Sequence, residues 1–158
     1  MQSLVESLLT TAKERGLKIA TAESCTGGMI SASLTEIAGS SAVFEYGFVT
    51  YANKAKMDML GVTSASLETY GAVSEQVAGE MAFGALDRSN ADIAVSVTGI
   101  AGPGGSEFKP EGRVCFGLAQ RDGETITQTV EFGAIGRENV RKQTTQHALK
   151  LLFKEISN

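Results

Sequence analysis

The chain has 158 residues, of which 42% are hydrophobic, so it is long enough for one compact domain with a buried core and too short for two ordinary ones. Its net charge of −4, without any basic run, argues against nucleic acid as the main partner, because phosphate backbones select clustered Lys and Arg. A small, locally bound ligand fits this composition better.

The composition of the chain and its first residues bear on the cellular compartment and on metal binding. Two cysteines make no disulfide framework, and the first residues form an amphipathic pattern rather than a signal peptide, so we expect a cytoplasmic protein. No apolar stretch approaches the roughly 20 residues of a membrane span, so no membrane partner is expected. A single histidine argues against a zinc site, and we expect neither a metal nor another cofactor.

The chain starts as alternating helices and strands. Hydrophobic periodicity predicts, in chain order, a helix over 3–15 that ends at Gly16, a buried strand over 17–22, a helix over 26–37 and a strand over 42–51. The strand over 42–51 is identified by its alternating aromatic and β-branched residues. This order is typical of an α/β protein.

Capping residues and glycines predict three more helices. Asn53 is expected to cap a short helix that Gly61 stops, a second short helix spans 64–70, and Ser74 caps a longer one that runs to about residue 88.

The second half of the chain completes the sheet. A strand over 92–97 leads into TGIAGPGG (98–105), which holds four of the 18 glycines and therefore forms a loop whose backbone can approach a ligand closely. Strands over 113–120 and 124–132 flank Asp122-Gly123, a hairpin signal, so the sheet includes an antiparallel pair.

A last helix over 137–156 closes the fold. Helices before, between and after the strands predict a three-layer α/β/α sandwich with a mixed, mostly parallel sheet. Because we find no internal repeat, linker or low-complexity segment, residues 1–158 are expected to form a single domain.

The segment KIATAESCTGG (18–28) concentrates chemistry at a strand-to-helix turn, where open α/β sheets bind ligands. Ser24 at this turn is a candidate nucleophile, with the helix N–H groups of Thr26, Gly27 and Gly28 stabilising an oxyanion. The alternative is that Ser24 caps the helix, a role in which serine is favoured.

A serine nucleophile needs a base, and with one histidine in the chain a lysine of lowered pKa is the realistic choice. Lys54 and Lys56 start the helix after the second strand, at the same edge of the sheet if the strands are parallel; the alternative for each is a solvated surface lysine. Cys25 with His147 as its base ranks below serine, because His147 lies beside core positions of the final helix.

Two further features suggest anion binding. The glycine-rich loop is neither a Walker A motif nor a dinucleotide fingerprint, but its backbone can form a nest for phosphate. Arg137 and Arg141 lie one helical turn apart and can share a phosphate, or instead form a solvated face paired with Glu138 or Glu131. We interpret the S-x-x-K spacing over 106–109 as coincidence, because it lies in a loop.

Five motifs resemble one family in order and spacing, and they span essentially the whole chain: TAESCTGG (21–28), TYANKAKMDMLGV (50–62), GAVSEQVA (71–78), VTGIAGPGG (97–105) and RENVRKQTTQHAL (137–149). The chain is similar to the CinA carboxy-terminal domain family, whose enzymatic members are nicotinamide mononucleotide deamidases. Full-length members carry an additional amino-terminal domain for which this chain has no room.

The resemblance implies hydrolysis of the carboxamide of nicotinamide mononucleotide to nicotinate mononucleotide and ammonia, in pyridine-nucleotide salvage. It implies that Ser24 is the nucleophile and Lys56 the general base, since Lys54 falls at a position that the family leaves variable. Tyr51 and Thr98 are implied to border the catalytic pocket, with Thr98 as a proton or orientation partner.

The resemblance also implies a nucleotide as the small-molecule partner and a homo-oligomer, since family proteins are often dimers. The competing hypothesis is a non-catalytic nucleotide-binding or regulatory module of the competence- or damage-inducible type. The residues expected to contact the substrate are Cys25, Thr26, Gly27, Gly28, Gly99, Gly102, Arg137 and Arg141.

Overall fold

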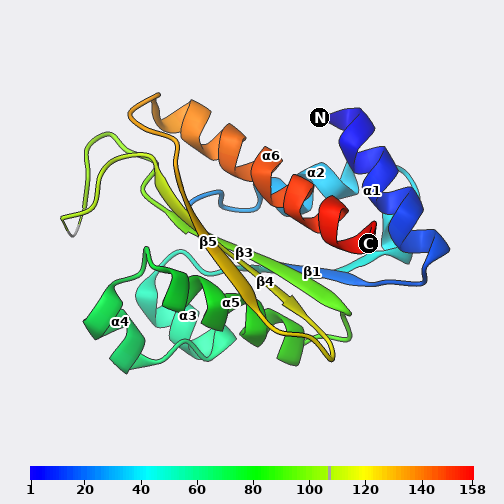
Figure 1. Ribbon diagram of the computed structural model, residues 1–158, viewed down its shortest axis with the longest axis horizontal. Coiled ribbons are helices and arrows are strands. Elements are labelled where there is room, and N and C mark those ends of the chain that lie inside the picture. Colours follow the sequence, from blue (N-terminus) through cyan, green and yellow to red (C-terminus); the bar gives the residue numbers. More distant parts are fainter. Residues whose placement is uncertain (107) are drawn as a thin grey trace.

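A computed structural model describes residues 1–106 and 108–158, and within them five strands form one sheet between two layers of helices (Figure 1). The strand order is β2-β1-β3-β4-β5. β1 pairs in parallel with β2 and β3, whereas β4 is antiparallel to both of its neighbours. The strands are β1 (Ile19–Glu23), β2 (Phe44–Val49), β3 (Ile93–Gly99), β4 (Arg113–Gln120) and β5 (Ile126–Glu131).

Helices α1, α2 and α6 cover one face of the sheet, and α3, α4 and α5 cover the other (Figure 1). The predicted three-layer sandwich with a mixed sheet is therefore confirmed. Within the described part of the chain, no helix is both long and apolar enough to cross a membrane. The helices are α1 (Gln2–Glu14), α2 (Met29–Thr35), α3 (Asn53–Leu60), α4 (Ser64–Tyr70), α5 (Glu75–Asp87) and α6 (Arg137–Ile156), with a 3-10 turn at Ser40–Ala42.

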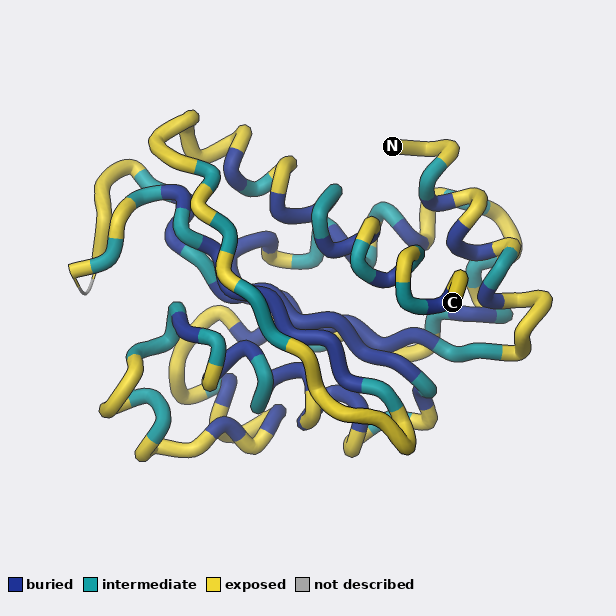
Figure 2. The backbone as a smooth tube through the Cα atoms, in the orientation of Figure 1, coloured by how far each residue is buried: buried dark blue, intermediate teal, exposed yellow. Residues whose placement is uncertain are grey.

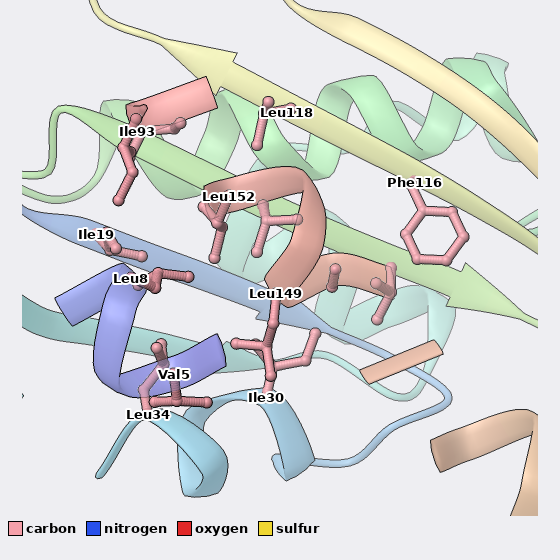
Figure 3. Packing of buried hydrophobic residues seen from close by; sticks show 14 of the residues in the cluster. Val5, Leu8, Ile19, Ile30, Leu34, Ile93, Phe116, Leu118, Leu149 and Leu152 are labelled. Carbon is pink, nitrogen blue, oxygen red and sulfur yellow. The ribbon is translucent and has the colours of Figure 1, made fainter. Parts of the chain in front are cut away.

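The two faces of the sheet are packed with side chains of different size. Toward α1, α2 and α6 the core is built from branched and aromatic residues, including Ile30, Leu149 and Phe116 (Figure 3). Toward α5 the strands present mainly alanine, as at Ala20 and Ala94, and the helix lies close to the sheet. The central strand β1 is buried along its whole length, and β3 and β4 are buried except at their ends. By contrast, β2 and β5 at the edges are partly exposed (Figure 2).

The order of the strands creates the crevice that holds the site. After β1 the chain crosses through α2 to β2 on one side, and from β2 it returns through α3, α4 and α5 to β3 on the other side of β1. Open α/β sheets bind ligands where the winding reverses in this way, outside the carboxyl ends of the strands. Ser24 directly follows β1 at this point, and the glycine-rich loop follows β3.

Element types match the prediction, and several boundaries differ. The helix expected over 26–37 begins only at Met29, because Gly27 and Gly28 have φ of 57° and 110° and cannot continue into a right-handed helix. Asn53 lies inside α3, and Ala52 stands at its N-cap, so the predicted cap at Asn53 is wrong. The capping role of Ser74 is confirmed, since its side chain accepts the N–H of Val77.

The close approach of α5 to the end of α3 gives a stability prediction. A methyl group at Gly84 would overlap the carbonyl oxygen of Leu60, so Gly84→Ala should lower the free energy of unfolding by about 1–3 kcal/mol or more, measured by urea denaturation. Gly79→Ala in the same helix is the control, because its Cβ would meet only methyl groups, the nearest 3.3 Å away, and should change stability by less than about 1 kcal/mol. Equal effects would contradict this account of the packing.

Candidate active site

A buried carboxylate organises the turn between β1 and α2. Glu23, the last residue of β1, is fully buried and accepts hydrogen bonds from the hydroxyl of Thr26 (2.6 Å) and the N–H groups of Gly28 (3.2 Å) and Ile30 (2.9 Å) on Oε1. Its Oε2 accepts the N–H (2.9 Å) and the hydroxyl (2.8 Å) of Ser31. Glu23 therefore caps α2 and carries the negative charge that a helix N-terminus favours.

Sequence reasoning missed Glu23 and offered Ser24, the next residue, as the cap of the helix. The capping interpretation of Ser24 is wrong, because Gly28 occupies the N-cap and the carboxylate takes the free N–H groups. The predicted oxyanion donors change accordingly: the N–H of Gly28 is bound by Glu23, and that of Gly27 donates to the carbonyl of Ser24 at 3.1 Å. Because α2 begins only at Met29, well after Glu23, the spacing of an ordinary N-cap does not identify this cap in the sequence.

Lys56 is the central cation of the site and is 1% exposed. Its Nζ lies 2.9 Å from Oγ of Ser24 and donates to the carbonyl oxygens of Thr50 (2.9 Å) and Tyr51 (3.0 Å). The predicted meeting of Ser24 and Lys56 is therefore confirmed. Within the residues described, Lys56 forms no ion pair with a carboxylate, and burial lowers its pKa from 10.5 to about 8.

The contacts of Lys56 determine what its amine can do. Two N–H bonds are directed at carbonyls, so in the neutral amine the remaining sp³ position, the lone pair, faces the hydroxyl of Ser24. Lys54, the other candidate base, is 84% exposed on its side chain and pairs with Asp58 on the helix surface. The solvated alternative therefore holds for Lys54 and fails for Lys56.

A cavity of about 320 Å³ opens above Ser24 and Lys56, at the size of small-ligand sites. Among its described lining residues, Lys56 and Arg137 carry the charge, and both are cationic, which suits an anionic ligand. The predicted site residues that line it are Ser24, Cys25, Tyr51, Lys56, Thr98, Gly99, Gly102 and Arg137. Thr26, Gly27, Gly28 and Arg141 were also predicted but do not line this cavity in the described part of the chain.

Arg137 links two segments at the mouth of the cavity through hydrogen bonds. Its guanidinium donates to the carbonyl of Gly102 in the glycine-rich loop (2.7 Å) and to the phenol oxygen of Tyr51 (3.1 Å). The hydroxyl of Thr98 donates to the carbonyl of Ala72 at 2.9 Å and so joins two segments that line the cavity.

The two arginines of α6 do not form the predicted joint phosphate clamp. Arg141 donates instead to the carbonyls of Cys25 (3.1 Å) and Thr26 (3.2 Å), behind the turn. The pairing of these arginines with Glu138 or Glu131 is also wrong, because Glu138 pairs with Lys142 and Glu131 with Arg113. The expected exposure holds for Arg137 and fails for Arg141, which is half-buried.

The cysteine-based alternative fails on geometry and charge. Cys25 is buried, and burial raises the pKa of its thiol to about 12, so the thiolate is disfavoured. His147 bonds through Nε2 to Gln128 (2.5 Å) and packs its ring on Phe116.

The S-x-x-K spacing places no catalytic pair. Ser106 and Lys109 bond to each other through their backbones, and the Lys109 ammonium donates to the carbonyl of Val73 (2.6 Å). Residue 107 of this motif lies outside the described residues.

Comparison with known proteins points to one family. A family model described as the CinA C-terminal domain matches residues 1–156. Proteins named nicotinamide-nucleotide amidohydrolase PncC are 53% identical over 145 residues in Enterobacter agglomerans, covering 91% of this chain and 88% of the relative, and 51% identical over 157 residues in Escherichia coli K12, covering 99% and 94%. The crystal structure of competence/damage inducible protein CihA from Agrobacterium tumefaciens is 50% identical, covers 99% of this chain and 95% of its own, and superimposes with a TM-score of 0.95.

The lowered pKa of Lys56 predicts a pH-dependent stability difference. Below pH 8 the folded protein holds a buried cation at a cost that the unfolded chain avoids, and this cost disappears as pH rises from about 8 to 10.5. The wild type should therefore gain stability relative to Lys56→Met across this window, by up to about 1.4 kcal/mol per pH unit in urea denaturation. Stability curves that run parallel for the two proteins would refute the shift.

Proposed function

The chain belongs to the CinA C-terminal domain family, and from this premise we propose that it is an amidohydrolase that converts nicotinamide mononucleotide to nicotinate mononucleotide and ammonia. Relatives that share about half of its residues over nearly its full length are named for hydrolysis of a nicotinamide nucleotide. The proposed physiological role is pyridine-nucleotide salvage.

The observation that carries this proposal is the contact between Ser24 and Lys56 at the base of the cavity. A hydroxyl 2.9 Å from a buried amine, whose pKa lies near neutrality, is an activated nucleophile. A base is most effective when its pKa lies near the working pH, and burial brings Lys56 to about 8. Amide hydrolysis needs both the nucleophile and the base.

The proposed reaction proceeds through an acyl-enzyme. Neutral Lys56 accepts the proton of Ser24 as Oγ attacks the carboxamide carbon, and the C=O electrons move onto oxygen to form a tetrahedral oxyanion. Lys56 then returns the proton to the amide nitrogen as the C–N bond breaks and ammonia leaves. Water, deprotonated by Lys56, attacks the resulting ester, and Ser24 leaves with that proton to restore the free enzyme.

The mouth of the cavity suits the rest of the nucleotide. The guanidinium of Arg137 offers charge-assisted hydrogen bonds to a phosphate, and the glycines of the loop after β3 allow close backbone approach. We assign Tyr51 and Thr98 to shaping the pocket, because their polar atoms are bonded to Arg137 and to the Ala72 carbonyl.

A second candidate is a regulatory module that binds a nucleotide without turnover, favoured by the competence/damage-inducible name of the Agrobacterium neighbour. An assay of ammonia release separates the two candidates. Binding of nicotinamide mononucleotide in calorimetry without ammonia release would favour the module.

The dyad predicts two inactive variants with a matched control. Ser24→Ala removes the nucleophile and Lys56→Met the base, so each should lower ammonia release from nicotinamide mononucleotide by at least about 10³-fold while the thermal melt shows a folded protein. Lys54→Met, two residues away and exposed, should keep the wild-type rate. Full activity in either dyad variant would reject the mechanism.

The base role of Lys56 predicts the pH profile. Because the neutral amine is the reactive form, kcat/KM should rise with pH through an apparent pKa of about 8 and then level off. The measurement is initial rates at low substrate from pH 6 to 10 with wild type and Lys54→Met. A profile that is flat or falling between pH 7 and 9 would contradict a lysine base.

A further inference from the structure

Asn53 lines the cavity, and the proposed reaction gives it no role. It is the first residue of α3, three residues before Lys56, and both residues border the cavity beside Ser24. Side chains three positions apart in a helix lie on the same face. The amide of Asn53 and the amine of Lys56 are therefore presented by one face of α3 to the same ligand space.

The hydrogen bonds of Lys56 carry its amine back to the start of α3. Nζ donates to the carbonyl oxygens of Thr50 and Tyr51, which both precede the helix. Long helical side chains lean toward the N-terminus in this way. The amine that contacts Ser24 thus lies beside the first turn, where Asn53 begins the helix. Asn53 therefore borders the space that the reacting group of a ligand must enter.

The side-chain amide of Asn53 is free to bind a ligand. Asn53 is exposed, and among the described residues its side chain has no hydrogen-bond partner. Two neighbouring hydroxyls on the cavity wall already form hydrogen bonds within the protein: Arg137 donates to that of Tyr51, and that of Thr98 donates to a backbone carbonyl. Asn53 therefore offers a ligand one acceptor oxygen and two N–H donors.

We propose that Asn53 is a specificity-determining residue that binds the carboxamide of the substrate, with Oδ1 accepting one of the carboxamide N–H groups. This inference rests on the proposed function, because it names the chemical group that the site recognises. The hydrogen bond holds the leaving nitrogen beside Lys56, which returns the proton to that nitrogen in the proposed reaction.

The proposed contact separates the substrate from the product. A carboxamide has two N–H groups to donate, whereas the carboxylate formed by hydrolysis has only acceptor oxygens. Nicotinate mononucleotide therefore lacks the bond to Oδ1 of Asn53, and a site built to bind an N–H group selects strongly against a ligand without one. Loss of this bond on hydrolysis also favours release of the product.

The test measures binding by calorimetry in a Ser24→Ala background, which does not consume the substrate. Asn53→Asp keeps an acceptor for the carboxamide N–H but places a negative oxygen against the product carboxylate. The ratio of the Kd of nicotinate mononucleotide to that of nicotinamide mononucleotide should therefore rise by at least about 10-fold. Because both ligands carry the same ribose and phosphate, the ratio reports on the group that differs.

Ser106→Asp is the matched control, because Ser106 lines the same cavity from the glycine-rich loop. It adds the same charge on another wall and should change the ratio by less than about threefold. In the active enzyme, Asn53→Ala should lower kcat/KM for nicotinamide mononucleotide by about 10-fold or more, because the carboxamide loses its acceptor.

Each outcome decides one hypothesis. An unchanged ratio in Asn53→Asp would place Asn53 against the shared ribose or phosphate, or away from the ligand, and would overturn the proposal, as would an equal rise in Ser106→Asp. If Asn53→Asp is unfolded in a thermal melt, Asn53→Ala carries the decision, because it should weaken binding of nicotinamide mononucleotide alone. A folded wild type that releases no ammonia would instead reject the proposed function.

Discussion

The site depends on the burial of one lysine, Lys56, which has no acidic partner among the residues that the structure describes. Lys56 is placed by consecutive parts of the chain: Thr50 and Tyr51, directly after β2, supply two carbonyls, and the first turn of α3 supplies the amine itself. Carbonyl dipoles compensate a buried ammonium less completely than a carboxylate does, so the neutral form becomes accessible near neutral pH. The same desolvation that weakens the fold at low pH provides the base.

Strand geometry directs the buried carboxylate of Glu23 away from Lys56. Side chains alternate across a strand, and Glu23 points to the α2 face, where five donors occupy its oxygens. Had it paired with Lys56, the pKa of the amine would rise and the base would be lost at neutral pH. Glu23 stabilises α2, Arg141 binds the turn carbonyls, and Lys56 faces Ser24, so each of these three groups has its own set of partners.

Much of the fold and the site follows from local sequence signals. The predictions that failed concern side-chain partners, which the folded backbone determines. Periodicity located every strand and helix type, and α6 begins and ends where predicted, because such patterns reflect burial along a single element. Ser24 and Cys25 were placed correctly at the carboxyl end of β1. Glu23 was missed because its partners are set by the positive φ of Gly27 and Gly28, which delays the start of α2.

The two arginines show what local sequence does not contain. Arg137 and Arg141 share a face of α6. Arg137 nevertheless reaches the glycine-rich loop and Arg141 the turn after Ser24, because these two segments lie beside different turns of the helix. Only the tertiary fold distinguishes the two destinations. Likewise, burial of Lys56 and exposure of Lys54 follow from how α3 packs on α5, and both lysines lie in the same polar stretch of sequence.

The most direct test of this account is an NMR titration of the Lys56 side chain, with the Cε resonance assigned by comparison with Lys56→Met. The account predicts a single transition near pH 8, well below the ordinary lysine pKa of 10.5. A Lys56 resonance that titrates at the ordinary lysine value instead would contradict it.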